Sequence, residues 1–172
     1  TLNGNTTGAV NADAVAGFNA SISDLNTMYA GAVSSGNGIT DIGDKSVTIT
    51  DTTVSDASTL NTLNGYTSGV ITADGVTALT GTASELNTLL TAGNDTNQFT
   101  STSFGSLTGV TVSDTTLNGA TLASAIDQAN IATGDTSVVF TITAADEIQG
   151  TEGNFTDLLT DEENSQISIT DQ

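Results

Sequence analysis

Hydrophobic residues along the chain follow two different periods, in short separate segments. In one kind of segment they occupy every second position, as Val47 and Ile49 do between hydroxyl-bearing threonines. Because side chains alternate between the two faces of a strand, this period predicts a β-strand with one buried and one polar face. In the other kind they lie three or four positions apart, as Leu60 and Leu63 do, which predicts a short amphipathic helix.

The two patterns alternate along the whole chain. We predict strands at 9–13, 46–51, 69–74, 109–114, 137–143 and 166–171. We predict helices at 20–30, 56–64, 82–91, 118–130 and 154–160. Ser or Asp precedes several of these helices and glycine follows several, which suits helix capping and termination. The segment 94–108 is predicted to be a long loop.

The segments also repeat in sequence. Residues 46–53 (Ser-Val-Thr-Ile-Thr-Asp-Thr-Thr) return as 109–116, at an offset of 63 positions, and in shortened form as 166–171. Residues 1–8 return as 62–69, at an offset of 61 positions. The repeat is therefore roughly 60 residues long and has two related halves, each consisting of a strand, a polar turn and a short helix.

This repeat predicts the organisation of the chain. We expect a single repeat-built unit over 1–172, with a partial repeat at 1–45, a full repeat at 46–108, a degenerate repeat at 109–165 and a terminal strand at 166–172. Each helix is too short to be stable alone, so stacking must bury its apolar face. The predicted fold class is α/β, a repeat protein of short strands and helices with a solenoid-like or parallel-rich sheet. A closed mixed sheet and a β-sandwich with helical caps are the alternatives.

Composition excludes most kinds of chemistry. The 172 residues include 20 Asp and Glu, 34 Thr, one Lys and no Arg, His, Cys or Trp, for a formal net charge of -19 at pH 7. No thiol or imidazole is present for catalysis, and no tryptophan platform accompanies the carboxylates, so we expect no enzyme. The charge repels nucleic acid, and no apolar run reaches the roughly 20 residues of a membrane span.

Three segments carry a resemblance: 82–89 (Thr-Ala-Ser-Glu-Leu-Asn-Thr-Leu), 60–65 (Leu-Asn-Thr-Leu-Asn-Gly) and 47–51 (Val-Thr-Ile-Thr-Asp). They resemble repeats of giant bacterial, notably cyanobacterial, extracellular proteins that are adhesin-like or associated with surface layers. The resemblance covers most of residues 1–130. The first phrase is also similar to repeats of phage tail-fibre proteins. Both resemblances imply an elongated, extracellular, non-catalytic structural role, and neither assigns a binding residue to this chain.

Several predicted strands end in aspartate, which suggests a calcium site. If parallel strands bring these carboxylates to one edge, a hard cation with oxygen ligands would relieve their repulsion. The candidate calcium ligands, including an acidic cluster near the last helix, are Asp51, Asp74, Asp114, Asp157, Asp161 and Glu163. Alternatively, each strand-end aspartate forms an Asx-turn or caps the next helix, and the cluster is a solvated face. No known calcium motif is present, and no cofactor is required.

The terminal strand suggests self-association. A solenoid exposes strand edges at its ends unless the chain belongs to a longer protein or another subunit covers them. We expect Ile167, Ile169 and Asp171 to pair head to tail with another copy by strand addition. The leading hypothesis is an extracellular or cell-surface structural protein that assembles into a filament or layer. A calcium-assisted adhesin module that contacts a glycan or cell surface, and a phage fibre segment, are the alternatives.

Overall fold

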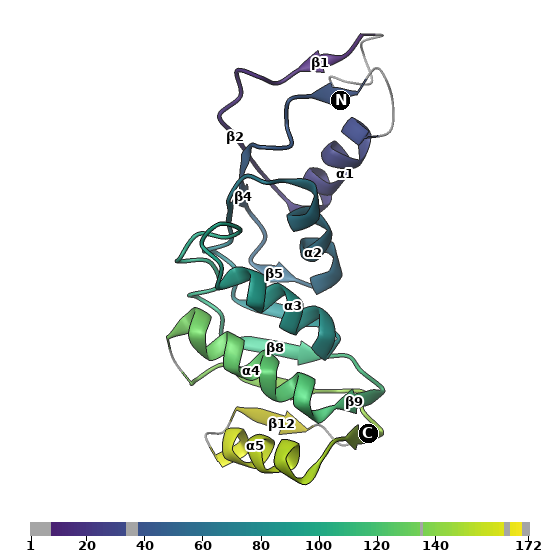
Figure 1. The fold of residues 1–172 in the computed structure, drawn as a ribbon, viewed down its shortest axis with the longest axis vertical. Helices are drawn as coiled ribbons and strands as arrows, with labels where there is room; N and C mark the ends of the chain where they lie inside the picture. The colour runs from purple at the N-terminus through teal and green to yellow at the C-terminus, as the bar shows by residue number, and fades with distance from the viewer. Residues whose placement is uncertain (1–7, 34–37, 135, 164–165, 170–172) are drawn as a thin grey trace.

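The computed structural model describes residues 8–33, 38–134, 136–163 and 166–169. The chain forms a stack of coils, each made of short strands followed by a helix, and the coils succeed one another along the long axis (Figure 1). Helices of neighbouring coils lie side by side, and strands of neighbouring coils pair in parallel. The α/β class with parallel sheets of alternating strands and helices is therefore confirmed.

In most of the described coils two strands precede the helix, and in the second coil three do. The first contains β1 (Val10–Asn11), β2 (Gly17–Ala20) and α1 (Ile22–Val33). The second contains β3 (Ile39–Thr40), β4 (Ser46–Ile49), β5 (Thr53–Val54) and α2 (Ala57–Tyr66). The third contains β6 (Ile71–Thr72), β7 (Ala78–Gly81) and α3 (Ala83–Gly93). Then follow β8 (Gly109–Val112), β9 (Thr116–Asn118) and α4 (Gly119–Thr133), and finally β10 (Val139–Ile142), β11 (Glu147–Gln149), α5 (Glu152–Glu163) and β12 (Ile167–Ile169).

The strands form staggered parallel stacks. Among the described residues the orders are β1-β3, β2-β4-β6, β5-β7-β8-β10-β12 and β9-β11. In the first coil α1 follows β2 directly, whereas the second coil continues past β4 and adds β5 before α2 begins. The fourth coil likewise continues past β8 into β9, which begins another stack, before α4 starts. The start of a new stack in every second coil accounts for the two halves of the repeat. Within the described residues, this parallel stacking excludes the mixed sheet and the β-sandwich.

All the predicted helices occur, with ends shifted by a few residues. Local chemistry accounts for several of the ends. Glu85 N donates to Thr82 Oγ1 at 3.3 Å, and Thr82 N donates to the Glu85 carboxylate at 2.8 Å, so α3 begins with a capping box. Asp56 caps α2 by accepting from Ser58 N at 2.9 Å. Helix α4 ends at Thr133, and its C-cap Gly134 has a φ of 66°, in the left-handed region that glycine adopts without steric cost.

Each predicted strand coincides with a shorter strand of the structure, whereas a second set of strands was not predicted. The unpredicted strands are β2, β3, β5, β7, β9 and β11. β3, β5, β9 and β11 contain only two or three residues, and the four-residue strands β2 and β7 contain glycine and alanine, which have low strand propensity. Their extended conformation comes from pairing with neighbouring coils, which local sequence does not encode.

The segment 94–108 forms the predicted long loop, and two phenylalanines anchor it. Phe99 makes an isolated parallel bridge with Ile71, and its ring centroid lies 5.4 Å from that of Phe104. Both rings are fully buried. The loop therefore contributes two aromatic side chains to the core.

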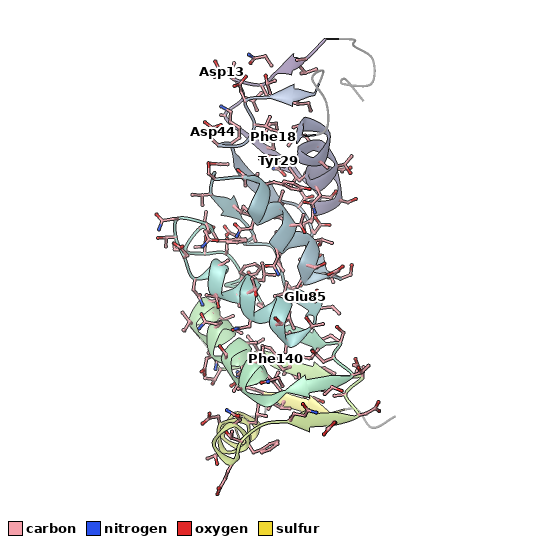
Figure 2. All side chains as sticks on the ribbon, turned by 45° about the vertical axis from the view of Figure 1, so that its right-hand side comes forward. Asp13, Phe18, Tyr29, Asp44, Glu85 and Phe140 are labelled. Atoms are coloured by element: carbon pink, nitrogen blue, oxygen red, sulfur yellow. The ribbon has the colours of Figure 1, made fainter. Side chains whose placement is uncertain are left out.

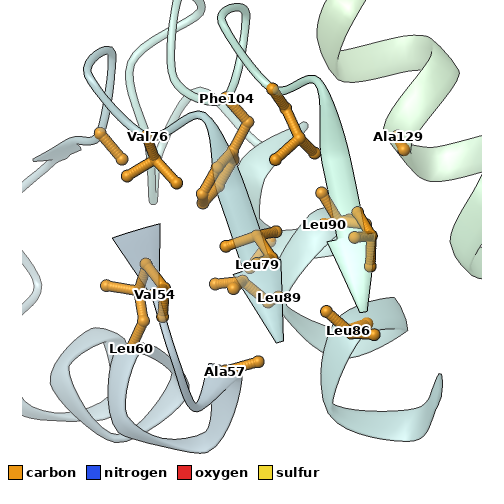
Figure 3. Close-up of a cluster of buried hydrophobic side chains, with 14 of the residues drawn as sticks. Val54, Ala57, Leu60, Val76, Leu79, Leu86, Leu89, Leu90, Phe104 and Ala129 are labelled. Carbon is orange, nitrogen blue, oxygen red and sulfur yellow. The ribbon is translucent and has the colours of Figure 1, made fainter. Parts of the chain in front are cut away.

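One apolar core runs between the strands and the helices. In β4, Val47 and Ile49 are buried while their neighbours are exposed, as the alternating pattern predicts. Figure 3 shows Val54 close to Leu60 and Leu79 close to Leu89, so strand and helix side chains meet across the layer. Full burial of each such side chain stabilises the fold by about 1.5–3 kcal/mol before the entropy of ordering is subtracted.

The outward positions of the main strands carry hydroxyl groups in register. Thr80, Thr111, Thr141 and Ser168 are successive neighbours across β7, β8, β10 and β12. These side chains are exposed or half-buried. The predicted polar strand face is therefore confirmed, and the repetition of this position accounts for part of the high threonine content.

Candidate functional site

Asp51 and Asp114 each bind the start of a helix in the preceding coil. Asp51 Oδ2 accepts a hydrogen bond from the backbone N–H of Ile22, the first residue of α1, at 2.7 Å. Asp114 Oδ2 accepts from the N–H of Ala83, the first residue of α3, also at 2.7 Å. Each carboxylate satisfies a helix N–H group that has no partner within its helix and lies at the positive end of the helix dipole. We call these two contacts the inter-coil clamps.

The clamps correct the expectation that these aspartates cap the next helix along the chain. Each carboxylate instead caps the helix before it. Parallel stacking is the physical reason, because it sets each of these strands beside the strand of the previous coil, where the earlier helix begins. The repeated aspartates thus hold consecutive coils together.

Asp74 lies at the corner between β6 and β7, which corresponds to the corner of Asp51 between β4 and β5. Its Oδ1 accepts from Thr100 Oγ1 at 3.2 Å and from Thr102 Oγ1 at 3.0 Å, and so it holds the loop 94–108. Asp114 lies at a different corner, between β8 and β9. Among the described residues these aspartates do not form the single acidic edge expected from the sequence, because the stacks are staggered.

The remaining predicted calcium ligands belong to α5. Asp157 is exposed there, whereas the side chains of Asp161 and Glu163 are outside the part of the chain that the structure describes. Within the described part, no group of three or more acidic side chains is arranged to hold a metal ion. Calcium binding at the end of α5 therefore stays a proposal.

The predicted assembly strand is paired on one side. β12 lies parallel to β10, with Ile167 opposite Phe140, and Phe140 N donates to the Gln166 carbonyl. Alternate residues of a parallel strand direct their backbone groups to opposite sides, so the N–H groups of Ile167 and Ile169 point away from β10. Asp171 lies outside the described residues.

Amide side chains that the sequence analysis missed connect the coils. Asn26 Nδ2 donates to the Thr59 carbonyl at 2.9 Å, which joins α1 to α2. Asn61 Nδ2 donates to the Glu85 carbonyl at 3.0 Å, which joins α2 to α3. The available signal was the triplet Leu-Asn-Thr, which recurs at 25–27, 60–62 and 86–88. Its leucine supplies the core and its asparagine the bridge.

Gln166 makes a comparable bridge at the entrance to β12. The residue is only 1% exposed, and its Nε2 donates to Asn130 Oδ1 of α4 at 2.7 Å. The following Ile167 is half-buried and packs against the core. These contacts fix the start of the terminal strand.

Lys45, the only basic side chain of the chain, is used within the fold. Its Nζ donates to the Asp13 carbonyl at 3.2 Å and lies 3.5 Å from Asp44 Oδ1. Figure 2 shows Asp13 and Asp44 on the same side of the N-terminal coils. Lys45 therefore connects the first two coils. Since the chain has no other lysine, no further carboxylate of the described region has a lysine partner.

Three aromatic side chains pack together in the N-terminal part of the core. The rings of Tyr29 and Tyr66 stack with centroids 6.0 Å apart, and Phe18 meets Tyr29 edge-on at 6.4 Å. The Tyr29 hydroxyl donates to the Ile42 carbonyl at 3.2 Å. Burial raises the pKa of Tyr29 and the negative charge of Asp44 raises it further, against a lowering by hydrogen bonding.

A groove of about 390 Å³ lies between the N-terminal parts of α1 and α2. The residues that line it include Ile22, Asn26, Asp51, Val54, Ser55 and Thr59. Asn26 Oδ1 is buried and has no hydrogen-bond partner in the described region. The groove joins an apolar wall to several oxygen atoms and was not indicated by the sequence.

Two further observations bear on function. None of the described helices combines the length and the apolar character that crossing a lipid bilayer requires. Comparison of the chain with models of protein families, with curated proteins and with solved structures gives no match.

Proposed function

We propose that this chain is a structural segment of an extracellular filament or surface layer, and that its copies join head to tail. The observation that carries the proposal is the way in which one coil adds to another. Parallel strands pair, an aspartate caps the preceding helix and an asparagine bridges two helices. These contacts are local to two neighbouring coils, so a coil of a second copy can add to β12 through similar ones.

The edges available for such addition support an open assembly. Among the described residues β12 pairs with β10 alone, at one end of the stack, and β2 pairs with β4 alone, near the other end. A contact between two different edges is heterologous. Copies joined by such a contact form an open filament, unless the rotation between successive copies closes them into a ring. A filament, or a layer of filaments, is the expected product.

An extracellular setting agrees with the composition and with the resemblance described above. The chain has no cysteine to be oxidised, and its net charge of -19 keeps an elongated array hydrated. The bonds between coils and the rows of threonine on the outward strand face suit a structural scaffold, a role that requires no catalytic group.

Sedimentation velocity over a range of protein concentrations tests the assembly. We expect the unmodified chain to form a growing series of oligomers. Ile169→Pro removes an N–H group on the open edge of β12, and deletion of 164–172 removes the strand, so both should leave monomers. Ser168→Ala is the matched control, since it preserves every N–H group of β12 and should assemble normally. A chain that stays monomeric at all concentrations, or variants that still assemble, would overturn the proposal.

A further inference from the structure

We propose that the outward face of the strands β7, β8, β10 and β12 binds the surface of ice, through the hydroxyl groups of Thr80, Thr111, Thr141 and Ser168. These four residues are direct neighbours in the register of successive strands, and we call them the hydroxyl row. The inference goes beyond the structural role proposed above. It does not depend on that role, because it concerns the face of the strands and not the open edge of β12.

The hydroxyl row lies on the side of the strands that faces away from the core. The residue before each threonine of the row is buried in the core, namely Leu79, Val110 and Phe140. Because successive side chains of a strand point to opposite faces, the row points outward. Its three threonines are half-buried between their neighbours and Ser168 is exposed, so a flat surface laid on this face would reach the row.

The hydroxyl groups of the row have no hydrogen-bond partner among the described residues. Threonines of the helices use theirs within the protein. Thr27, Thr62 and Thr88 each donate to the backbone carbonyl four residues earlier. A hydroxyl group without a partner in the protein is satisfied by water or by a ligand, so the row holds adjacent sites for water.

Parallel pairing sets the spacing of these sites. Neighbouring strands lie about 4.7–4.9 Å apart, so the hydroxyl groups repeat at this distance and span about 14 Å over the four strands. Threonine is branched at Cβ, which restricts its χ1 angle and fixes the direction of the hydroxyl group. Oxygen atoms on a prism face of hexagonal ice repeat at a similar spacing. Water held by the row therefore lies close to positions of the ice lattice.

The face around the row is uncharged, although the chain has a net charge of -19. The outward residues beside the row, in register with one another, are Ala78, Gly109 and Val139. Covering a carboxylate with an uncharged solid would remove its water and provide no partner charge. Small uncharged side chains avoid this cost, and their methyl groups fit against ice together with those of the threonines.

Two other occupants fit the face less well. Sheets that pack face to face interdigitate apolar side chains, whereas a second copy would bury the hydroxyl row without providing matched partners. A crystalline polysaccharide would require aromatic rings on which its sugars stack, and the outward positions of these four strands contain none in the part of the chain that the structure describes. Ice requires only ordered water sites.

The growth of single ice crystals in solutions of the full chain tests the proposal. We expect the unmodified chain to give faceted crystals and to lower the freezing point below the melting point, because adsorbed protein stops the growth of the crystal face. Thr111→Lys places a long charged side chain in the middle of the hydroxyl row and should abolish both effects. Thr88→Lys makes the same change at an exposed position of α3 and should leave both effects unchanged.

Two further measurements guard against trivial explanations. Circular dichroism checks that each variant is folded, and Ser168→Lys, at the exposed end of the row, should weaken ice shaping even if Thr111→Lys does not fold. Sedimentation of Thr111→Lys should match that of the unmodified chain, because the substitution leaves the backbone groups of β12 intact. Loss of association in this variant would assign the face to contact between copies.

Three results would overturn the proposal. One is rounded ice growth, with equal freezing and melting points, in the unmodified chain. The second is equal ice shaping by Thr88→Lys and by a folded variant of the row. The third is the loss of association in Thr111→Lys described above. Sedimentation of the unmodified chain tests the structural role separately, so failure of either proposal can be recognised without the other.

Discussion

At the scale of single residues, a few polar side chains decide how one coil meets the next. Asp51 and Asp114 occupy equivalent places in the repeat and make equivalent bonds to α1 and α3. A carboxylate at the start of a helix accepts the hydrogen bond of a backbone N–H group that would otherwise bind water. Its negative charge also interacts favourably with the positive end of the helix dipole. In a stack without disulfides, such bonds help to fix the register of neighbouring coils.

The clamps lead to a prediction for stability. Asp51→Ala and Asp114→Ala should each lower the free energy of unfolding by about 1–2 kcal/mol, the usual effect of losing a helix cap. Asp51→Asn and Asp114→Asn keep an acceptor oxygen and should lower it by less. Urea unfolding followed by circular dichroism measures the differences. Asp157→Ala removes the same charge from an exposed position and should change stability by less than about 0.5 kcal/mol. If it matches Asp51→Ala, the clamp does not contribute.

Asp95, in the loop 94–108, gives a prediction for acid. The Gln98 side-chain hydrogen bond, followed by bonds from the backbone and side chain of Asn97, holds the pKa of Asp95 below its usual value of 3.8. As the pH falls, the unfolded chain therefore takes up this proton first. The stabilisation is fully present above pH 3.8 and is lost as the pH falls through the lower folded pKa.

The comparison of the wild-type chain with Asp95→Asn measures this loss. The stability difference between the two should be constant near neutral pH and shrink in acid, and urea unfolding at a series of pH values down to about 2.5 would show it. Both chains share the other carboxylates, so the general relief of charge repulsion cancels in the difference. A difference that does not change with pH, or that grows in acid, would contradict the assignment.

At the scale of elements, sequence patterns predict what is local and miss what depends on neighbours. Helix α3 was predictable because Thr82, Glu85 and the leucines after them encode both its cap and its buried face. Strand β7, Ala78–Gly81, was not predictable, since its extended conformation depends on β5 and β8. The same reason applies to the site. The repeated aspartates could be recognised as candidate calcium ligands or helix caps, but their partners and the groove beside Asn26 require knowledge of which coil lies next to which.

Two glycines illustrate the difference between local and neighbour effects. A Cβ atom at Gly69, just before β6, would overlap the carbonyl group of Lys45 in the previous coil. A Cβ at Gly65, in the last turn of α2, would meet nothing within 4 Å. Gly69→Ala should therefore destabilise by about 1–3 kcal/mol, as overpacking does. Gly65→Ala should be neutral or stabilising by up to about 1 kcal/mol, because alanine favours the helix.

Thermal or urea unfolding should show a loss of stability for Gly69→Ala and no loss for Gly65→Ala. Equal effects would mean that the close approach of Gly69 to the preceding coil does not constrain the stack. A loss of stability in Gly65→Ala alone would contradict both expectations.

At the scale of the whole molecule, charge is the main opposing force. Twenty acidic residues face one lysine, and Lys45 is held between Asp13 and Asp44. The acidic side chains of the described region are spread over several corners and helix surfaces, so their repulsion acts over many distances and is weakened by mobile ions. Assembly of such chains brings like charges together and should depend on salt even more strongly than folding does.

Salt should therefore raise both the unfolding midpoint and the degree of association. The screening length falls from about 30 Å at 0.01 M to about 8 Å at 0.15 M, so most of the gain should occur over this range. Diffuse screening makes no distinction between Ca²⁺ and Mg²⁺, and we expect both chlorides at equal concentration to give the same midpoint. A calcium site at Asp157, Asp161 and Glu163 would instead raise the midpoint with Ca²⁺ alone, by mass action on the folded state. A chelator, or the substitution Asp161→Asn, would then abolish the additional stabilisation by Ca²⁺. Such a result would mean that the chain tolerates its charge through specific calcium binding and not through diffuse screening.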